Sequence, residues 1–371
     1  MNRLWPEFDK QTMDFIREAI ESRRWAIAQP GGEDSFIDRV EAALARRFGK
    51  AHAVTTCNGS AAIVIALQAL GIGPGDGVVC PATTWIGCAT SILRVGATPI
   101  FVDAEVATPL MNFDELEDLQ TPIPIRAVLA VHLYASRLNI LKLRQMFPRA
   151  KIIEDSSHSF SVSEHADVTV CSLQATKILT CGEGGVAFTY DPELARNMEA
   201  LRADGRIRDL EDRAAGLSPH VIQGANYAMS EVTAALLADQ LDRFSQQCKR
   251  RRRGLGDAVD LEECREKELL ISSVEAEAAG TFHGVPFVTA DPERTISLLD
   301  PEEFGFRLSR AYPPVPEYRQ FADMPLAHAR AGYLSTRLEN SERWYRSSVI
   351  IPHEAFLDQQ PKFFEFLRSQ P

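Results

Sequence analysis

Lys177 is the residue that says most about the chemistry of this chain. It lies in the run SLQATKILTCGEGG (172–185), among small residues and before a glycine-rich turn. A lysine ε-amine that is shielded from water loses its proton readily and attacks an aldehyde to form a Schiff base. A lysine in a loop is more often a solvated surface charge. Whether Lys177 is a nucleophile or a surface residue therefore has to be judged from the residues upstream of it.

Two further titratable residues lie close together in the sequence. Asp155 ends the run KIIED (151–155), which has the composition of a buried strand. Open α/β sheets place their ligand chemistry at strand ends. A buried carboxylate needs a cationic partner, and a protonated pyridine nitrogen, an arginine or a helix N-terminus would each serve. His158 is placed to hydrogen-bond a phenolic oxygen, although a single histidine of this kind is more often structural.

The run CNGSAA (57–62) indicates a phosphate site at the start of a helix. Gly59 lets the backbone approach a ligand, the free N–H groups of the first turn favour an anion, and Ser60 adds a hydroxyl. The alternative is that Ser60 is an ordinary N-cap. Ser172, at the end of a later strand, would give the phosphate a second hydroxyl. Trp85 follows another strand, where it would either stack on a flat ligand or pack in the core.

The elements that position these residues alternate between strands and helices. Runs rich in Val, Ile and Ala lack period-two polarity, which is typical of strands buried on both faces. We expect strands at 52–56, 78–80, 98–102, 127–131, 151–154, 167–171 and 185–190. We expect helices at 60–70, 84–95, about 140–147 and 192–203. This order predicts an α/β fold with a mainly parallel seven-stranded sheet flanked by helices. The candidate residues would then share one sheet edge, and in this chain order they describe a site for pyridoxal 5′-phosphate.

The rest of the chain divides around that sheet. We expect an N-terminal arm and helix at 1–30, a large cofactor-binding domain at 31–245 and a smaller α+β domain at 246–371. Two helices precede the sheet, and their apolar faces are expected to pack in the core. These faces consist of Met13, Ile16 and Ile20 in the first helix, and Phe36, Val40, Leu44 and Phe48 in the second. We interpret the basic run at 249–253, followed by Gly254-Leu-Gly256, as a solvated helix end and a domain hinge.

Composition excludes several classes of function. The chain has 371 residues and a formal net charge of −11, which argues against nucleic acid or an anionic membrane as a main partner. Its seven cysteines are odd in number and form no Cys-x-x-Cys, which favours free thiols in a reducing cytoplasm over disulfides or a metal site. No apolar run approaches the roughly 18 residues of a membrane span.

Taken together, these runs resemble the DegT/DnrJ/EryC1/StrS family of pyridoxal-phosphate sugar aminotransferases, whose fold is type I. The runs that carry the resemblance are GSAA (59–62), GPGD (73–76), GATPIFVD (96–103), VHLY (131–134), ED (154–155), GEGG (182–185) after Lys177, and NYAMSE (226–231). The resemblance implies that Lys177 forms the Schiff base, that Asp155 pairs with the pyridine nitrogen and that Trp85 stacks on the ring. It further implies that Gly59, Ser60 and Ser172 hold the phosphate, and that His158, where glutamine is usual, contacts the ring oxygen. Asn226 would reach the cofactor of a neighbouring subunit, which implies a homodimer.

Some runs are similar to the aminocyclitol branch of this family, which implies an amino donor of L-glutamine or L-glutamate and a cyclic ketone acceptor in secondary-metabolite or aminoglycoside-type biosynthesis. They are RRWAI (23–27), TW (84–85), SLQATK (172–177), LRADGR (201–206), YPP (312–314) and IPH (351–353). Many sugar-nucleotide members carry a basic residue where this chain has Ala228, which disfavours a nucleotide diphosphate. The alternatives are a sugar-nucleotide aminotransferase, a dehydratase of the same family, in which histidine replaces the lysine, and a non-transaminating protein that binds the cofactor.

Overall fold

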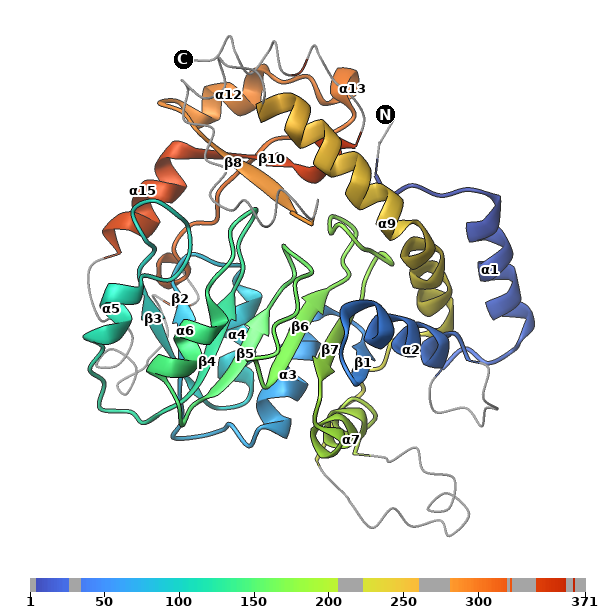
Figure 1. Cartoon of the computed structure of the whole chain (residues 1–371), viewed down its shortest axis with the longest axis horizontal. Coiled ribbons are helices and arrows are strands. Elements are labelled where there is room, and N and C mark those ends of the chain that lie inside the picture. Colours follow the sequence, from blue (N-terminus) through green and yellow to red (C-terminus); the bar gives the residue numbers. More distant parts are fainter. Residues whose placement is uncertain are drawn as a thin grey trace.

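The large domain is built around one seven-stranded sheet (Figure 1). The computed structural model describes residues 5–26, 35–205, 223–259, 281–318, 321, 338–357 and 363. Some of the expected features lie outside the described residues. They are Ile27 and Arg206, which end two of the runs named above, Cys264, and the domain boundary expected between residues 30 and 31. The strands are β1 (His52–Thr56), β2 (Gly77–Pro81), β3 (Thr98–Val102), β4 (Ile125–Val131), β5 (Lys151–Asp155), β6 (Val168–Ser172) and β7 (Gly185–Thr189). Their order across the sheet is β1-β7-β6-β5-β4-β2-β3.

The sheet is parallel from β3 to β6, and β7 runs antiparallel to both of its neighbours. Both faces are covered. Val78 and Cys80 point into one core, whereas Val79 between them points into another. This alternation of two apolar sides explains why the strands read as continuous apolar runs. The expected seven-stranded α/β fold is confirmed, with each strand within two residues of its expected limits.

Two layers of helices enclose the sheet. One face carries α3 (Gly59–Ala69), α4 (Gly87–Arg94) and α7 (Pro192–Leu201). The other face carries α2 (Phe36–Phe48), α5 (Phe113–Glu117), α6 (Ile140–Met146) and the long helix α9 (Glu231–Val259). No helix in the described ranges is both long and apolar enough to cross a bilayer. All the cysteines of those ranges are free thiols.

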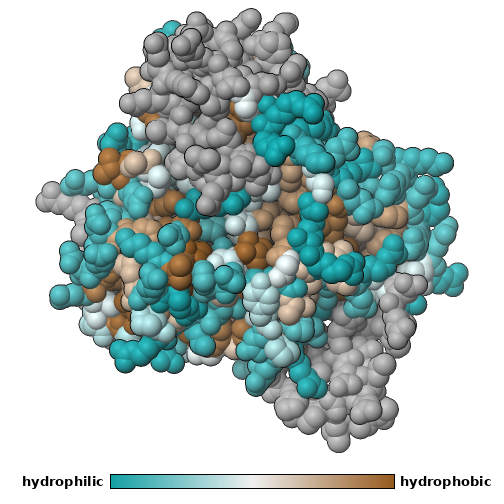
Figure 2. Space-filling view, viewed as in Figure 1, coloured by the Kyte–Doolittle hydropathy of each residue, from teal (hydrophilic) through white to brown (hydrophobic). Residues whose placement is uncertain are grey.

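The C-terminal region forms a second, smaller layer above the sheet (Figure 1). Its strands are β8 (Gly284–Val288), β9 (Ser309–Arg310) and β10 (Ser348–Pro352), in the order β8-β10-β9. Its helices are α12 (Pro292–Leu298), α13 (Pro301–Phe304), η1 (Val315–Glu317), α15 (Glu339–Ser347) and η2 (His353–Phe356). A separate apolar cluster, which includes Phe282, Phe287 and Phe356, gives this region a core of its own. Figure 2 shows that polar residues cover much of this side of the molecule, while apolar residues gather near its centre, between the two layers.

The interpretation of residues 249–253 as the end of a helix is wrong, although Lys249, Arg252 and Arg253 are exposed as expected. Helix α9 continues through this run and through Gly254 and Gly256 to Val259. Arg251 is completely buried in it. A Cβ on Gly254 would lie 2.3 Å from the carbonyl oxygen of Phe356, so the glycine permits α9 to pack closely against η2. The expected boundary at 245/246 therefore falls inside a continuous helix.

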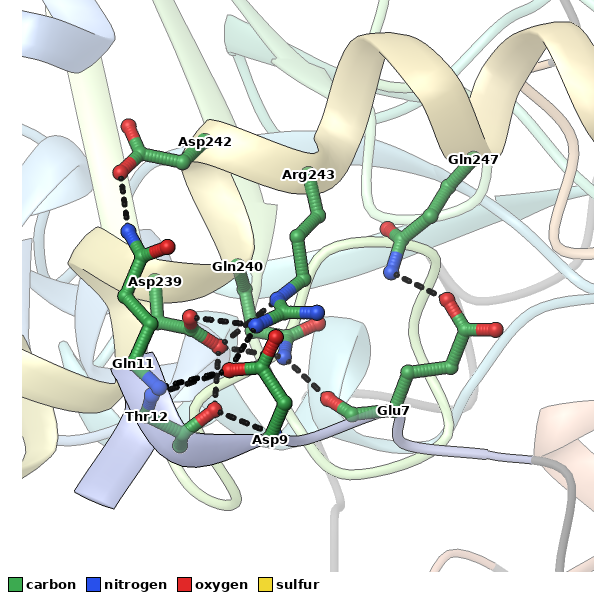
Figure 3. Close-up of polar contacts among 9 residues, drawn as sticks. All are labelled: Glu7, Asp9, Gln11, Thr12, Asp239, Gln240, Asp242, Arg243 and Gln247. Carbon is green, nitrogen blue, oxygen red and sulfur yellow. Dashed lines mark hydrogen bonds and ion pairs between the residues drawn. The ribbon is translucent and has the colours of Figure 1, made fainter.

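The first helix, α1 (Lys10–Glu21), packs differently from expectation. Met13 and Ile20 are 54% and 49% exposed, so the expected burial of this face is wrong for a single chain. Polar contacts instead attach α1 to α9, as Figure 3 shows. Thr12 Oγ1 donates to the buried carboxylate of Asp239 at 2.8 Å, and Arg243 bridges Asp239 and Asp9. Helical periodicity identified an apolar stripe on α1 but not the element that covers it.

Candidate active site

A cavity of about 640 Å³ opens where the parallel strands end. Its walls come from the segments that follow β1, β2, β5 and β6, as expected for the ligand site of an open α/β sheet. The structure brings seven of the predicted site residues to this one cavity. They are Gly59, Ser60, Trp85, Asp155, His158, Ser172 and Lys177.

Asp155 is the last residue of β5 and lies at the floor of the cavity. It pairs in register with Val131 of β4 and Val170 of β6, and its side chain is 5% exposed. Its Oδ1 accepts the backbone N–H of Ser157 at 3.0 Å, and its Oδ2 faces the thiol of Cys88 at 3.4 Å. A thiol is a weak donor, so Oδ2 retains the capacity to bind a cationic N–H. No arginine pairs with Asp155 among the described residues.

Lys177 enters the same cavity from the loop after β6. The turn that carries it is closed by a bond from its backbone N–H to the carbonyl of Gln174 at 2.8 Å. Burial lowers the pKa of its amine from 10.5 to about 8, and the charge of Asp155 offsets part of this effect. The side chain is 9% exposed, so the surface-charge reading of Lys177 is wrong. With this pKa the amine is still mostly charged at pH 7, but about half of the molecules carry a neutral amine at pH 8.

The N-terminus of α3 forms a cradle beside Ser172. Asn58, rather than Ser60, caps the helix, because its Oδ1 accepts the N–H of Ala61 at 2.8 Å. The N-cap alternative for Ser60 is therefore wrong, and its hydroxyl is free for another role. A Cβ on Gly59 would lie 2.8 Å from Cβ of Ser172, so only glycine lets these two segments approach. The first N–H groups of a helix have no partner within the helix and suit an anion.

Trp85 and His158 flank the cavity. Trp85 is 55% exposed, which excludes the core-packing alternative, and its ring lies 5.8 Å from that of Tyr312. His158 is buried, and its Nδ1 accepts the backbone N–H of Tyr134 at 3.1 Å. Because a backbone N–H can only donate, the ring proton of neutral His158 must be on Nε2. Burial and the nearby charge of Lys177 hold the pKa of His158 well below its usual value, so the ring is a neutral donor.

Asn226 is the one predicted site residue outside this cavity. Its backbone forms an isolated antiparallel bridge with Ala203, and its side chain is not among those that line the cavity. The cavity wall also contains residues that the sequence did not predict as site residues, among them Cys88, Ser157 and Asn58. Ser157 accepts the backbone N–H of Ser172 through its hydroxyl at 2.8 Å and so joins the loops after β5 and β6. The sequence could have identified Ser157, because it follows Asp155 by two residues and therefore lies just beyond the end of the same strand.

Comparisons with known proteins identify the family of this chain. Residues 7–361 match the DegT/DnrJ/EryC1/StrS aminotransferase family, and the chain belongs to that family. It is 31% identical to the L-glutamine:2-deoxy-scyllo-inosose aminotransferase of Micromonospora echinospora, over 99% of this chain and 93% of the relative. It is 32% identical to the enzyme of the same name from Streptoalloteichus tenebrarius, over 86% and 80% of the two chains. The solved structure of S. venezuelae DesV, in complex with a ketimine intermediate, superposes with a TM-score of 0.79 at 25% identity and covers 96% of this chain and 93% of its own.

The protein is therefore a pyridoxal-phosphate-dependent aminotransferase of fold type I. The described residues fit that cofactor. The cradle at Gly59 suits a phosphate. Oδ2 of Asp155, which accepts only from the weak thiol donor of Cys88 among the described residues, suits a pyridinium N–H, and Lys177 supplies a buried amine. The expected family, enzyme class and cofactor are confirmed.

Proposed function

We propose that this enzyme transfers an amino group from L-glutamine or L-glutamate to a cyclic ketone of the aminocyclitol or keto-sugar class, in antibiotic-type secondary metabolism. The observation that carries the proposal is the buried, depressed-pKa amine of Lys177 in one cavity with the carboxylate of Asp155. Two features support the acceptor class. Relatives over nearly the whole chain are named for an inosose acceptor. Ala228 packs against the core formed by α2 and α9. By the family resemblance, many sugar-nucleotide members carry a basic residue at this position.

We further propose a role for each side chain of the cavity. The first turn of α3 with Gly59, together with the hydroxyls of Ser60 and Ser172, holds the cofactor phosphate. Asp155 holds the proton of the pyridine nitrogen, and His158 donates its Nε2–H to the ring oxygen. When bound, pyridoxal phosphate supplies an electron-withdrawing ring that stabilises negative charge on the carbon next to nitrogen.

Trp85 covers the exposed side of that ring. A planar ligand in this cavity would lie against the indole, and the contact of the indole with Tyr312 limits its rotation. Trp85 also keeps water from the reacting atoms, which strengthens the attraction between Asp155 and any bound cation.

Lys177 moves the proton. Its pKa of about 8 would make the neutral amine available as a base that accepts a proton at Nζ and gives it up again. A lysine with an ordinary pKa of about 10.4 would be almost entirely protonated at neutral pH. Burial in the loop after β6 therefore converts this side chain into a base.

We also propose a homodimer in the cytoplasm. Asn226 lies outside the cavity of its own chain, as a residue that serves a neighbouring subunit would. Apolar side chains at the N-terminal arm, among them Met13 and Ile20, are exposed in the single chain and would be covered by a partner. The free thiols favour a reducing compartment.

The first test is the visible absorption spectrum of the purified enzyme. We expect a band from the lysine-bound cofactor that bleaches on addition of L-glutamine, and no band in Lys177→Ala. Scyllo-inosose and 2-deoxy-scyllo-inosose should restore the band after bleaching, whereas nucleotide-linked keto sugars should not. Restoration by the nucleotide sugars alone would replace the acceptor class with the sugar-nucleotide one. A band that never bleaches with any amino donor would indicate a non-transaminating protein.

A further inference from the structure

Two buried side chains bind backbone carbonyl oxygens of the residues before and after Lys177. Arg251 of α9 donates one guanidinium N–H to the carbonyl oxygen of Ile178 at 3.2 Å. His353, at the start of η2, lies with its Nε2 3.2 Å from the carbonyl oxygen of Thr176. Neither side chain lines the cavity, and both are 0% exposed. They thus contact the residues before and after Lys177 from behind the site.

The two side chains also fix one another. Nε of Arg251 lies 3.2 Å from Nδ1 of His353. A guanidinium can only donate, so Nδ1 must accept and the imidazole proton must be on Nε2. That proton then points to the carbonyl of Thr176. Burial and the charge of Arg251 lower the pKa of His353 well below its usual value, which keeps the ring in this neutral form.

A cation at this position is costly for the fold. Among the described residues, no carboxylate lies within ion-pair distance of Arg251, and one of its terminal nitrogens has no hydrogen-bond partner. Burial lowers the pKa of its guanidinium to about 10. The centroid of the Trp5 ring lies 5.1 Å from Cζ of Arg251, and this cation–π contact compensates only part of the hydration that the guanidinium loses on burial. An apolar side chain of similar size would fill this space without an unpaired buried charge.

We propose that Arg251 and His353 are positioning residues for Lys177, which fix the direction of its side chain by restraining the backbone on both sides of it. His353 holds the peptide group between Thr176 and Lys177, and Arg251 holds the one between Ile178 and Leu179. The inference rests on the proposed role of Lys177 in the cofactor site. The Cα of Lys177 lies between these two peptide groups, so a small shift of the backbone at either one moves the far end of the side chain by a larger distance. Lys177 reaches toward Asp155 over a long, flexible stem, and its own turn provides a single backbone bond to Gln174. The pair adds the restraint that this turn lacks.

The pair also links the C-terminal layer to the chemistry. Arg251 comes from α9, and His353 comes from the segment after β10, whereas Lys177 belongs to the large domain. The backbone N–H of His353 is in turn bonded to the carbonyl of His283, and that of His283 to the carbonyl of His158 in the cavity wall. Lys177 is therefore held correctly only when the smaller layer is docked on the sheet.

The test compares Arg251→Met with Arg243→Met. Both variants remove a guanidinium from α9, but Arg243 pairs with Asp9 and Asp239 on the side of α1, away from Lys177. The readouts are the rate at which the visible band forms when pyridoxal phosphate is added to cofactor-free protein, and the affinity for pyridoxamine phosphate. The first depends on Lys177, whereas pyridoxamine phosphate fills the same cavity without reacting with a lysine.

We expect Arg251→Met to form the band about 10- to 100-fold more slowly, as a small misplacement of a reacting group does, while its affinity for pyridoxamine phosphate stays within about threefold. Arg243→Met should match the wild-type rate. His353→Gln, which keeps a donor near the position of Nε2, should retain most of the rate, and His353→Phe should lose it.

An unchanged rate in Arg251→Met would overturn the proposal, and so would an equal loss in Arg243→Met or a parallel loss of pyridoxamine phosphate binding. If Arg251→Met does not fold, equal rates for His353→Gln and His353→Phe would overturn it instead. A wild-type enzyme that forms no band at all would refute the proposed role of Lys177, which is a separate failure.

Discussion

Replacing Lys177 with methionine should make the cofactor-free protein more stable. Burial takes the pKa of the amine from 10.5 in water to about 8 in the folded chain, and this difference corresponds to about 3 kcal/mol of unfavourable free energy for the charged form. Methionine has a similar length and no charge to desolvate. At pH 7 we therefore expect the free energy of unfolding of Lys177→Met to exceed that of the wild type by about 3 kcal/mol.

The gain in stability of Lys177→Met over the wild type should depend on pH. Below pH 8 the amine is charged in both the folded and the unfolded chain, and the folded chain carries the full cost of desolvation. Between pH 8 and 10.5 the folded chain releases the proton while the unfolded chain keeps it, so the cost declines. The advantage of Lys177→Met should be complete at pH 7 and small at pH 10.

Urea unfolding of the cofactor-free proteins at pH 7 and pH 10 measures this difference. Lys50→Met is a matched control, because Lys50 is also buried but its ammonium donates to the carbonyl of Ser163 at 2.7 Å and lies over the ring of Tyr190. That variant should lose stability at pH 7, since it leaves the carbonyl unpaired. If Lys177→Met is no more stable than the wild type at pH 7, or equally favoured at both pH values, the amine is not desolvated as the structure describes.

Three further predictions concern the cavity and α9. Asp155→Asn removes the charge that raises the pKa of Lys177, so acylation of this lysine in the cofactor-free protein should begin at lower pH, as measured by mass spectrometry. An unchanged dependence of acylation on pH would contradict the electrostatic coupling of Asp155 and Lys177. Gly59→Ala places a Cβ 2.8 Å from Cβ of Ser172 and should weaken pyridoxal phosphate binding at least about tenfold in a folded protein, measured by absorbance titration; unaltered affinity would show that the cradle is elsewhere. Arg243→Met leaves the fully buried Asp239 without its cation and should cost about 3 kcal/mol in urea unfolding without changing cofactor affinity.

Most of the sheet and much of the site could be predicted from the sequence. Apolar runs without polar alternation located the strands, and the carboxyl ends of parallel strands necessarily meet at one edge. That rule alone placed Asp155, Ser172 and Lys177 near one another. Cys88, one of the residues that were missed, enters the cavity from α4, and the position of a residue in a helix does not by itself show which neighbour its side chain faces.

The errors have a common physical origin. The stripe of Met13 and Ile20 has the period of a packed helix, but periodicity does not name the covering element, and in a single chain none covers it. The basic run at 249–253 has the composition of a solvated helix end, yet Gly254 lets α9 press against η2 and carry Arg251 into the interior. Burial of a charged residue depends on contacts between segments that are distant in the sequence, which composition does not record.

The sequence by itself determined the α/β order, the edge at which the chemistry lies and the types of group that meet there. Local composition suffices for these because strand burial and strand direction follow from neighbouring residues. The tertiary structure alone decided the electrostatics. It buried the amine of Lys177, set the tautomer of His158 through Tyr134, and brought Arg251 and His353 behind the lysine. A pKa depends on how much water and which charges surround a group, and both are fixed only when the whole chain has packed.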